Sequence, residues 1–179
     1  MIPPPRFPSS VPPSEAARNG CPIVTDANGA MWVFGYGSLM WHPDFPHRES
    51  MPALLRGYHR ALCVYSTRYR GTAECPGLVL GLDRGGSCRG RAFRVAPDDA
   101  EAVRDYLWER EMNGYAYLPK WLRVRTPDGT VPALAFVVDR ERSADYTGRL
   151  DDESLLTCVL GGRGHRGSSL EYLESTVRH

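Results

Sequence analysis

Residues 31–41 read MWVFGYGSLMW, and this stretch decides how the fold begins. Its first four residues are large and apolar, which predicts a buried β-strand. The strand leads directly into Gly35-Tyr36-Gly37-Ser38, where two glycines permit unusual backbone angles and close contact with a ligand. Successive N–H groups of such a loop can form an anion-binding nest, whereas the plainer interpretation is a strand bend or bulge. No G-K-[ST] follows, and no third glycine or βαβ unit is present, so a Walker loop and a dinucleotide fingerprint are both excluded.

Further strands are predicted from apolar and β-branched runs at 54–65, 78–83, 89–95, 121–125 and 133–139. Arg84-Gly85-Gly86-Ser87 is predicted to be a turn between two of these strands, and Pro127-Asp128-Gly129 a turn between two others. Short links of this kind join antiparallel neighbours. Because helices come late and do not alternate with the strands, we expect an α+β fold with a closed or half-closed sheet.

Three helices are predicted. The first begins at Pro97-Asp98-Asp99, where an aspartate can cap it, and ends near Asn113-Gly114. The second covers roughly 152–160 and stops at two glycines. The third begins at Ser168 with Glu171 three residues on, which is the pattern of a capping box, and continues to the end of the chain.

The chain has 179 residues, enough for one domain with a real core. Residues 1–30 are rich in proline and poor in apolar residues, so we expect a flexible tail, apart from a possible packed end, followed by a single domain over 31–179. The five cysteines form no C-x-x-C pair, which argues against a disulfide framework and a zinc ribbon and favours a reducing cytoplasm. The apolar runs are too short to span a bilayer, and no signal peptide is recognisable.

The net charge is +1, and Lys120 is the single lysine. The arginines are scattered along the chain, as is usual for solvated strand edges or salt-bridge partners, so no nucleic-acid or membrane surface is expected. We expect a monomer that acts on a small molecule. The histidines have no metal spacing, so we expect no metal, and no G-x-S-x-G elbow marks a serine nucleophile.

Glu111 is singled out by helical spacing. In the predicted first helix, Ala100, Val103 and Leu107 form an apolar stripe whose next position is Glu111, whereas Glu101 and Glu109 fall away from it. Burial and the negative end of the helix dipole both raise the proton affinity of a carboxylate at this place, as general acid–base catalysis requires. The alternative is a structural glutamate paired with one of the arginines.

These motifs resemble those of the γ-glutamylcyclotransferases, most closely the glutathione-specific ChaC branch. Residues 33–41, VFGYGSLMW, resemble the family's opening motif. RGT at 70–72 with PGLVL at 76–80 resembles the segment after its second strand. Tyr106-Leu107, Arg110-Glu111 and Gly114-Tyr115 resemble its "YL…RE…GY" helix, and Gly167 followed by EYL at 171–173 resembles its C-terminal helix. The four matches occur in the family's order and leave only the tail uncovered.

The resemblance implies a small barrel-like mixed or antiparallel sheet with packed helices. It also implies that Glu111 is the general acid–base. The substrate-binding loop would consist of Val33, Phe34, Gly35, Tyr36, Gly37, Ser38 and Leu39, and Tyr115 and Tyr172 would lie near the site.

The activity implied is degradation of glutathione to 5-oxoproline and Cys-Gly. Two alternatives stay open. The first is a cyclotransferase for other γ-glutamyl peptides or γ-glutamylamines. The second is a catalytically silent γ-glutamyl-binding module, against which the presence of Glu111 argues.

Overall fold

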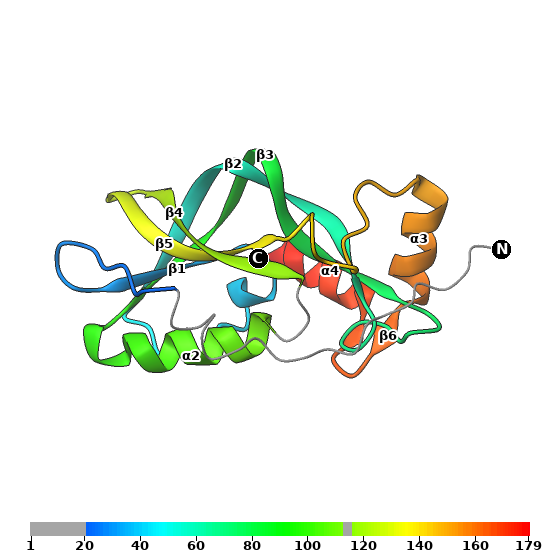
Figure 1. Ribbon diagram of the computed structural model, residues 1–179, viewed down its shortest axis with the longest axis horizontal. Coiled ribbons are helices and arrows are strands. Elements are labelled where there is room, and N and C mark those ends of the chain that lie inside the picture. The colour runs from blue at the N-terminus through cyan, green and yellow to red at the C-terminus, as the bar shows by residue number, and fades with distance from the viewer. Residues whose placement is uncertain (1–20, 113–115) are drawn as a thin grey trace.

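Five strands form a closed barrel in the computed structural model, which describes residues 21–112 and 116–179. The strands are β1 (Met31–Gly35), β2 (Glu49–Ser66), β3 (Gly77–Val95), β4 (Tyr117–Thr126) and β5 (Gly129–Val138). Their order around the barrel is β1-β3-β2-β4-β5. Neighbours are antiparallel except where β5 closes the barrel on β1 in parallel, with Val33 opposite Leu134. The predicted α+β fold with a barrel-like mixed sheet is therefore confirmed (Figure 1).

β1 is buried on both faces, as its apolar sequence predicts. Trp32 and Phe34 belong to one hydrophobic cluster with β2, β3 and β5, whereas Met31 and Val33 pack in a second cluster with the helix α2 (Ala100–Glu111). All five residues of the strand are buried. Because successive side chains point to opposite faces of a strand, a strand between two apolar layers needs an unbroken apolar run.

The predicted turn at Arg84-Gly85-Gly86-Ser87 is wrong, because β3 continues through it as one strand of 19 residues. Arg56 pairs with Ser87 and Tyr58 with Arg84, so the single residue Gly57 of β2 lies opposite the two glycines of β3. All three glycines have positive φ, at +85°, +99° and +68°. The glycines thus form a β-bulge in a long two-stranded ribbon, since they allow the bulge without ending either strand. Figure 1 shows this ribbon arching over the molecule.

The other predicted turn, at Pro127-Asp128-Gly129, is confirmed as the link between β4 and β5. The first helix is preceded by a 3₁₀ turn, η2 (Pro97–Asp99), and Asp99 occupies the predicted N-cap position, but its side chain makes no capping hydrogen bond. The N–H of Asp99 instead donates to the Ala96 carbonyl at 3.1 Å, and the N–H of Ala100 donates to the Pro97 carbonyl of the 3₁₀ turn. The predicted stop at Asn113-Gly114 lies outside the described residues.

The C-terminal part contains α3 (Asp152–Gly161), a short hairpin of β6 (Arg163–Gly164) and β7 (Gly167–Ser168), and α4 (Ser169–Arg178). The predicted capping box of α4 is confirmed: Ser168 Oγ accepts from the N–H of Glu171 at 3.1 Å, and Glu171 Oε2 accepts from the N–H of Ser168 at 2.8 Å.

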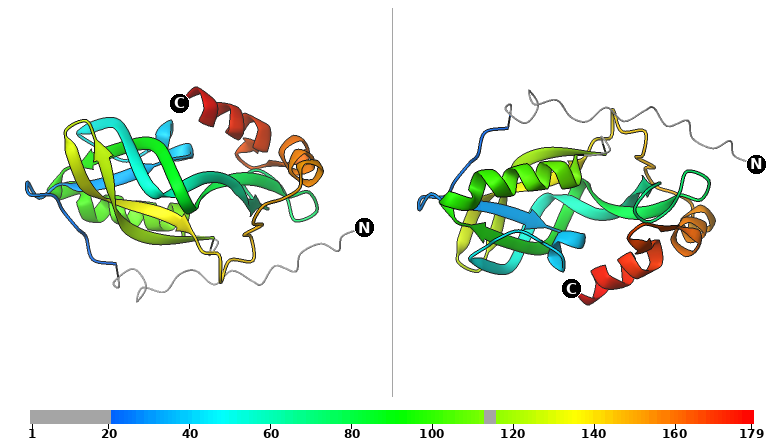
Figure 2. Two further views of the ribbon diagram at one scale, coloured as in Figure 1. Left: turned by 90° about the horizontal axis from the view of Figure 1, so that it is seen from above. Right: turned by 90° about the horizontal axis from the view of Figure 1, so that it is seen from below.

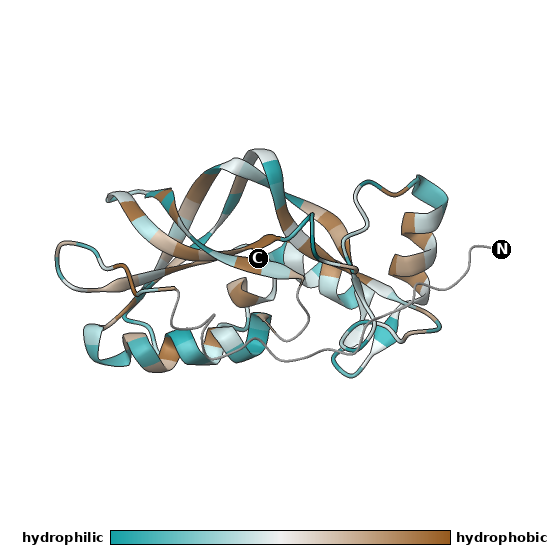
Figure 3. Ribbon diagram, in the orientation of Figure 1, coloured by the Kyte–Doolittle hydropathy of each residue, from teal (hydrophilic) through white to brown (hydrophobic). Residues whose placement is uncertain are grey.

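The helices lie on different sides of the barrel. α2 runs along the outside of β1, whereas α3 and α4 gather toward the far ends of β2 and β3 (Figure 2). Hydrophobic and hydrophilic residues alternate along α2 (Figure 3), and its stripe of Ala100, Val103 and Leu107 is buried against the barrel.

Residues 21–30, the end of the predicted tail, pack against the domain where the structure describes them. Cys21 and Ile23 contact the cluster between α2 and the barrel, and Asp26 Oδ2 accepts a hydrogen bond of 2.9 Å from Trp32 Nε1. The division of the chain at residue 31 stays a prediction.

Candidate active site

The glycine loop after β1 is held by close packing. A Cβ on Gly35 would lie 3.0 Å from Leu39 Cβ, and one on Gly37 would lie 2.6 Å from the Tyr172 hydroxyl oxygen. Beyond Gly37 the chain turns into η1 (Ser38–Met40), whose first hydrogen bond runs from the N–H of Met40 to the Gly37 carbonyl at 2.8 Å. The N–H groups before Met40 are therefore left over by this turn, as at the start of any helix.

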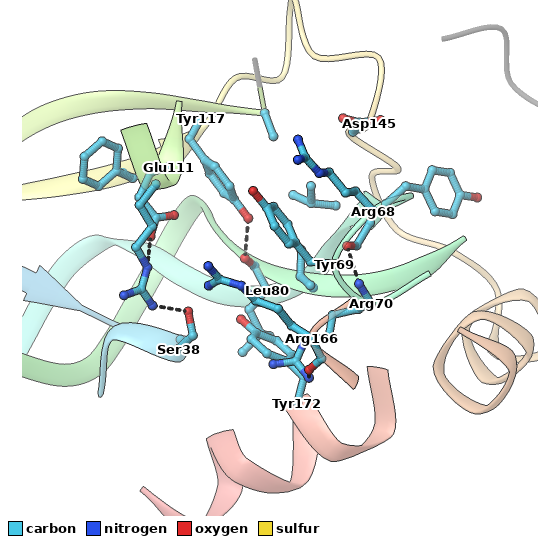
Figure 4. Close-up of a pocket in the computed structure, with 18 of the residues that line it drawn as sticks. Ser38, Arg68, Tyr69, Arg70, Leu80, Glu111, Tyr117, Asp145, Arg166 and Tyr172 are labelled. Carbon is cyan, nitrogen blue, oxygen red and sulfur yellow. Dashed lines mark hydrogen bonds and ion pairs between the residues drawn. The ribbon is translucent and has the colours of Figure 1, made fainter. Parts of the chain in front are cut away.

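A cavity of about 690 Å³ opens beside this loop. Its walls come from the loop itself (36–39), from the end of β2 and the segment after it (64–70), from the last turns of α2 and from the C-terminal hairpin and helix. This volume lies in the range of about 300–1,000 Å³ that small-ligand sites occupy. Figure 4 shows the side chains of several of these segments pointing toward one another.

Glu111 lies on the wall of this cavity at the end of α2, where the apolar stripe leads. Its side chain is 18% exposed, and burial raises the pKa of the carboxyl group above its usual value, against the opposing effect of Arg110 and Arg166. Glu101 and Glu109 are exposed, as their positions predict. A carboxylate whose pKa is raised by burial in a cleft is a candidate acid–base group.

Arg110 fastens the end of α2 to the glycine loop. Its Nε lies 3.3 Å from Glu111 Oε1, and its Nη2 donates to Ser38 Oγ at 3.0 Å. Its Nη1 also donates to the His42 carbonyl at 2.7 Å and to the Tyr106 hydroxyl at 2.8 Å. The ion pair with Arg110 therefore also agrees with the alternative prediction, in which Glu111 is a structural glutamate paired with an arginine. Because Arg110 bonds both Ser38 and the carboxylate, it sets the distance between the loop and Glu111.

Three buried tyrosines, Tyr36, Tyr117 and Tyr172, line the same cavity as Glu111. The Tyr36 hydroxyl donates to the Phe136 carbonyl at 2.9 Å, and the Tyr117 hydroxyl donates to the Leu80 carbonyl at 3.0 Å. Burial raises the pKa of Tyr36, Tyr117 and Tyr172, and the charge of Glu111 raises each further. All three therefore stay neutral hydroxyl groups beside the carboxylate at neutral pH.

The structure brings most, but not all, of the predicted site residues to the cavity. Tyr36, Gly37, Ser38, Leu39, Glu111 and Tyr172 line it. Val33, Phe34 and Gly35 belong to β1 instead, with Val33 and Phe34 buried in the two hydrophobic clusters. Tyr115 lies outside the described residues.

Sequence reasoning missed Tyr117 and most of the arginines of the cavity. Arg68, Arg70, Arg110, Arg142 and Arg166 all line it, together with the acids Glu109, Glu111 and Asp145. The expectation that the arginines are solvated or salt-bridge partners does not conflict with this position, since Arg110 is paired with Glu111 and Arg68 and Arg166 are exposed. No local pattern marks these arginines, because they come from segments that meet only in the folded chain.

Within residues 21–112 and 116–179, no group of three or more His, Cys, Asp and Glu side chains is arranged to hold a metal ion. In the same residues, no helix has the length and apolar character needed to cross a bilayer.

The sequence of this chain is similar to one protein family and to several named proteins. The sequence profile of the family described as "ChaC-like protein" matches residues 31–179. The chain is 38% identical to the glutathione-specific gamma-glutamylcyclotransferase of Escherichia coli over 82% of its own length and 64% of that protein. It is 34% identical to glutathione-specific gamma-glutamylcyclotransferase 1 of Homo sapiens over 95% of its own length and 76% of that protein. The chain thus spans about two thirds to three quarters of these curated relatives.

The fold also has a solved counterpart. The crystal structure of a gamma-glutamyl cyclotransferase specific to glutathione from yeast superposes with a TM-score of 0.74 at 22% identity, over 83% of this chain and 86% of that one. At this identity the likeness shows a shared fold.

Proposed function

This chain belongs to the ChaC-like protein family, and on that premise we propose that it is a γ-glutamylcyclotransferase that degrades glutathione. The observation that carries the proposal is the position of Glu111, a carboxylate with a raised pKa on the wall of the cavity that the glycine loop borders. The names of its relatives supply the substrate.

The proposed reaction is an intramolecular aminolysis. The α-amine of the glutamyl residue attacks the γ-carbonyl carbon and forms a five-membered lactam. The bond from that carbon to the cysteine nitrogen then breaks, which releases 5-oxoproline and Cys-Gly. Nucleophile and electrophile belong to one molecule, so the enzyme folds the substrate into the reactive conformer and moves protons. This chemistry requires neither a metal nor a cofactor.

Glu111 supplies the proton transfers. At neutral pH the α-amine is an ammonium group and cannot attack, so a carboxylate must first remove a proton. The same group, now protonated, then donates to the leaving nitrogen. Burial raises the pKa of Glu111 toward neutral pH, which makes it easier both to accept the proton of the amine and to donate a proton to the leaving nitrogen.

The glycine loop binds the glutamyl end. Its N–H groups before Met40 are left over by η1, and they suit the α-carboxylate and the tetrahedral oxyanion. Arg110 keeps this loop next to Glu111 through Ser38. Tyr36 and Tyr172, buried and neutral, border the same space and exclude water from it.

We place the catalytic unit in residues 31–179 and the protein in a reducing cytoplasm, where its five free thiols stay unpaired. We propose that the protein acts as a monomer.

The test is a product assay. Purified protein is incubated with glutathione and, separately, with one γ-glutamyl amino acid and one γ-glutamylamine, and 5-oxoproline is measured by mass spectrometry. We expect 5-oxoproline and Cys-Gly in equal amounts from glutathione and much slower release from the other two. Preference for either of these would indicate a different cyclotransferase, and no product from any of the three would indicate a binding module.

A further inference from the structure

Two arginines that line the cavity flank one aromatic ring. The guanidinium carbon of Arg166 lies 5.1 Å from the ring centroid of Tyr69, and that of Arg68 lies 5.7 Å from it. All three residues line the cavity, and Tyr69 lies between the two arginines in Figure 4. We call these three residues the Arg68–Tyr69–Arg166 cluster. Stacking on a ring holds a guanidinium plane in place and leaves its N–H edge free for a ligand.

The backbone positions this cluster before any ligand arrives. The N–H of His165 donates to the Arg68 carbonyl at 3.1 Å, and the N–H of Arg166 donates to the Tyr69 carbonyl at 2.9 Å. A Cβ on Gly164 would lie 2.6 Å from the Arg68 carbonyl oxygen, so only glycine permits this approach. Arg70 adds hydrogen bonds from Nη1 to the carbonyls of Arg166 and Ser168. These hydrogen bonds join the two segments before a ligand binds, which reduces the entropy lost on binding.

The charges of the cavity favour an anion at this cluster. Five arginines and three acids line the cavity, and Arg110 is already paired with Glu111. Among the described residues, no carboxylate lies within 4.0 Å of the guanidinium groups of Arg68 and Arg166. Both side chains are exposed at the rim, so a substrate can reach them.

Arg166 also connects the cluster electrostatically to the reaction centre. Arg166 and Glu111 line the same cavity, and the positive charge of Arg166 lowers the pKa of the Glu111 carboxyl group. The glycine loop binds the α-carboxylate of the glutamyl residue. A second carboxylate that reaches the cluster must therefore belong to the leaving group, on the other side of the scissile bond. The glycine carboxylate of glutathione has this position.

We propose that Arg68 and Arg166, held on Tyr69, bind the carboxylate at the leaving-group end of the substrate and so make this enzyme select γ-glutamyl peptides that end in a free carboxylate. The inference rests on the proposed function. Because the cluster lies at the solvent-exposed rim, its contribution is modest: a charge pair there changes affinity by about two- to fivefold, and two guanidinium groups together by about three- to tenfold.

The experiment pairs an enzyme change with a substrate change. Glutathione and its C-terminal carboxamide, which differ by one charge, are assayed with the wild type, with Arg68→Ala, Arg166→Ala and the double variant, and with Arg149→Ala as an exposed control outside the cavity. We expect the wild type to lose about three- to tenfold in kcat/KM on the carboxamide, mostly in KM. The double variant loses the same factor on glutathione and no longer distinguishes the two substrates. Arg149→Ala behaves as the wild type.

Three outcomes would overturn the inference. If the wild type makes no 5-oxoproline from glutathione, the proposed function fails and the inference fails with it. If the wild type turns over both substrates equally well, the function stands and the cluster has no role in selection. If the double variant loses equally on both substrates, with or without a lower melting temperature, the two arginines serve the structure of the hairpin instead. Partial rescue by Arg166→Lys on glutathione alone would support the charge interaction.

Discussion

Two largely buried carboxylates, Asp83 in β3 and Glu111 at the end of α2, have opposite surroundings. Asp83 accepts hydrogen bonds from Arg140 Nε, from the Tyr146 hydroxyl at 3.0 Å and from the N–H of Arg84 at 2.9 Å. Burial by itself would raise the pKa of Asp83, but these donors outweigh it and hold the pKa below its usual value. At Glu111 the effect of burial is larger than that of the positive charges of Arg110 and Arg166, so the pKa of the carboxyl group is raised.

The difference separates a structural carboxylate from a candidate catalytic one. Asp83 joins the long ribbon to the segment after β5, because its carboxylate is paired with Arg140 and hydrogen-bonded to Tyr146 there. Glu111 faces a cavity and shares its one ion pair within the described residues with an arginine that also holds the loop. A protein that buries a carboxylate without enough donors loses stability, and such sites are where catalysis is usually found.

The largest effect is expected when the acid chemistry of Glu111 is removed. We expect Glu111→Gln to lower kcat on glutathione by about 10²–10⁴, because glutamine keeps the shape and cannot transfer the proton. The binding of glutathione, measured by calorimetry, stays nearly unchanged. Glu101→Gln, on the exposed side of the same helix, is the control and keeps full activity. If Glu111→Gln retains turnover within a few-fold of the wild type, Glu111 is a structural residue like Asp83.

The next largest effect is expected at Gly37. A side chain there meets the Tyr172 hydroxyl, since a Cβ would lie 2.6 Å from its oxygen. We expect Gly37→Val to displace either the loop or Tyr172 and to lower kcat/KM by about 10², as small misplacements of a reacting group do.

Ser38→Ala is the matched control for Gly37→Val. It removes only the hydrogen bond from Arg110 Nη2, so we expect a loss of about two- to fivefold in kcat/KM. Equal losses in the two variants, measured at the same pH and temperature, would contradict the close-packing argument.

Local patterns in the sequence predict the parts of this molecule that depend on near neighbours. The apolar run of β1, the capping box of Ser168 and Glu171, and the stripe that ends at Glu111 each depend on residues a few positions apart, and the structure contains all three. The bulge of β3 could not be predicted in this way. Gly85-Gly86 has the local chemistry of a turn, and the residue that makes it a bulge, Gly57, lies in another strand.

The dependence on near neighbours also decides which residues of the candidate site can be predicted from the sequence. Glu111 and Gly37 follow from helix spacing and from the loop motif. Tyr117, Arg68 and Arg166 carry no local signal, because their roles arise from contacts of β4 with β3 and of the segment after β2 with the C-terminal hairpin. Val33 and Phe34 belong to the recognisable motif and yet serve the core, since a motif on a strand includes the residues that hold the strand in place.

A smaller effect is expected at Asp83, where a substitution should change the stability of the protein and leave its activity unchanged. Asp83→Asn weakens the ion pair with Arg140 while the hydrogen-bonding shape is largely kept. Because the Arg140 side chain is 38% exposed, we expect a moderate loss of about 1–2 kcal/mol in the free energy of unfolding at pH 7, measured with urea. The kcat on glutathione stays unchanged. A loss of turnover without a loss of stability would contradict the structural role of Asp83.

The smallest effect is the pH dependence of stability, where the two carboxylates should show opposite signs. The pKa of Asp83 is lowered in the folded protein, so its stabilisation is present above the usual aspartate pKa of about 3.9 and is lost as the pH falls through the folded value. The pKa of Glu111 is raised, so its favourable contribution is present below the usual glutamate pKa of about 4.3 and is lost as the pH rises through the folded value. Relative to the wild type, Glu111→Gln should therefore gain stability between acid and neutral pH, whereas Asp83→Asn should lose it over its own range. Urea unfolding of the wild type and both variants at several pH values from 3 to 7 measures this. Stability differences that change in the same direction with pH for both variants would mean that Glu111, like Asp83, has all the donors that its charge needs.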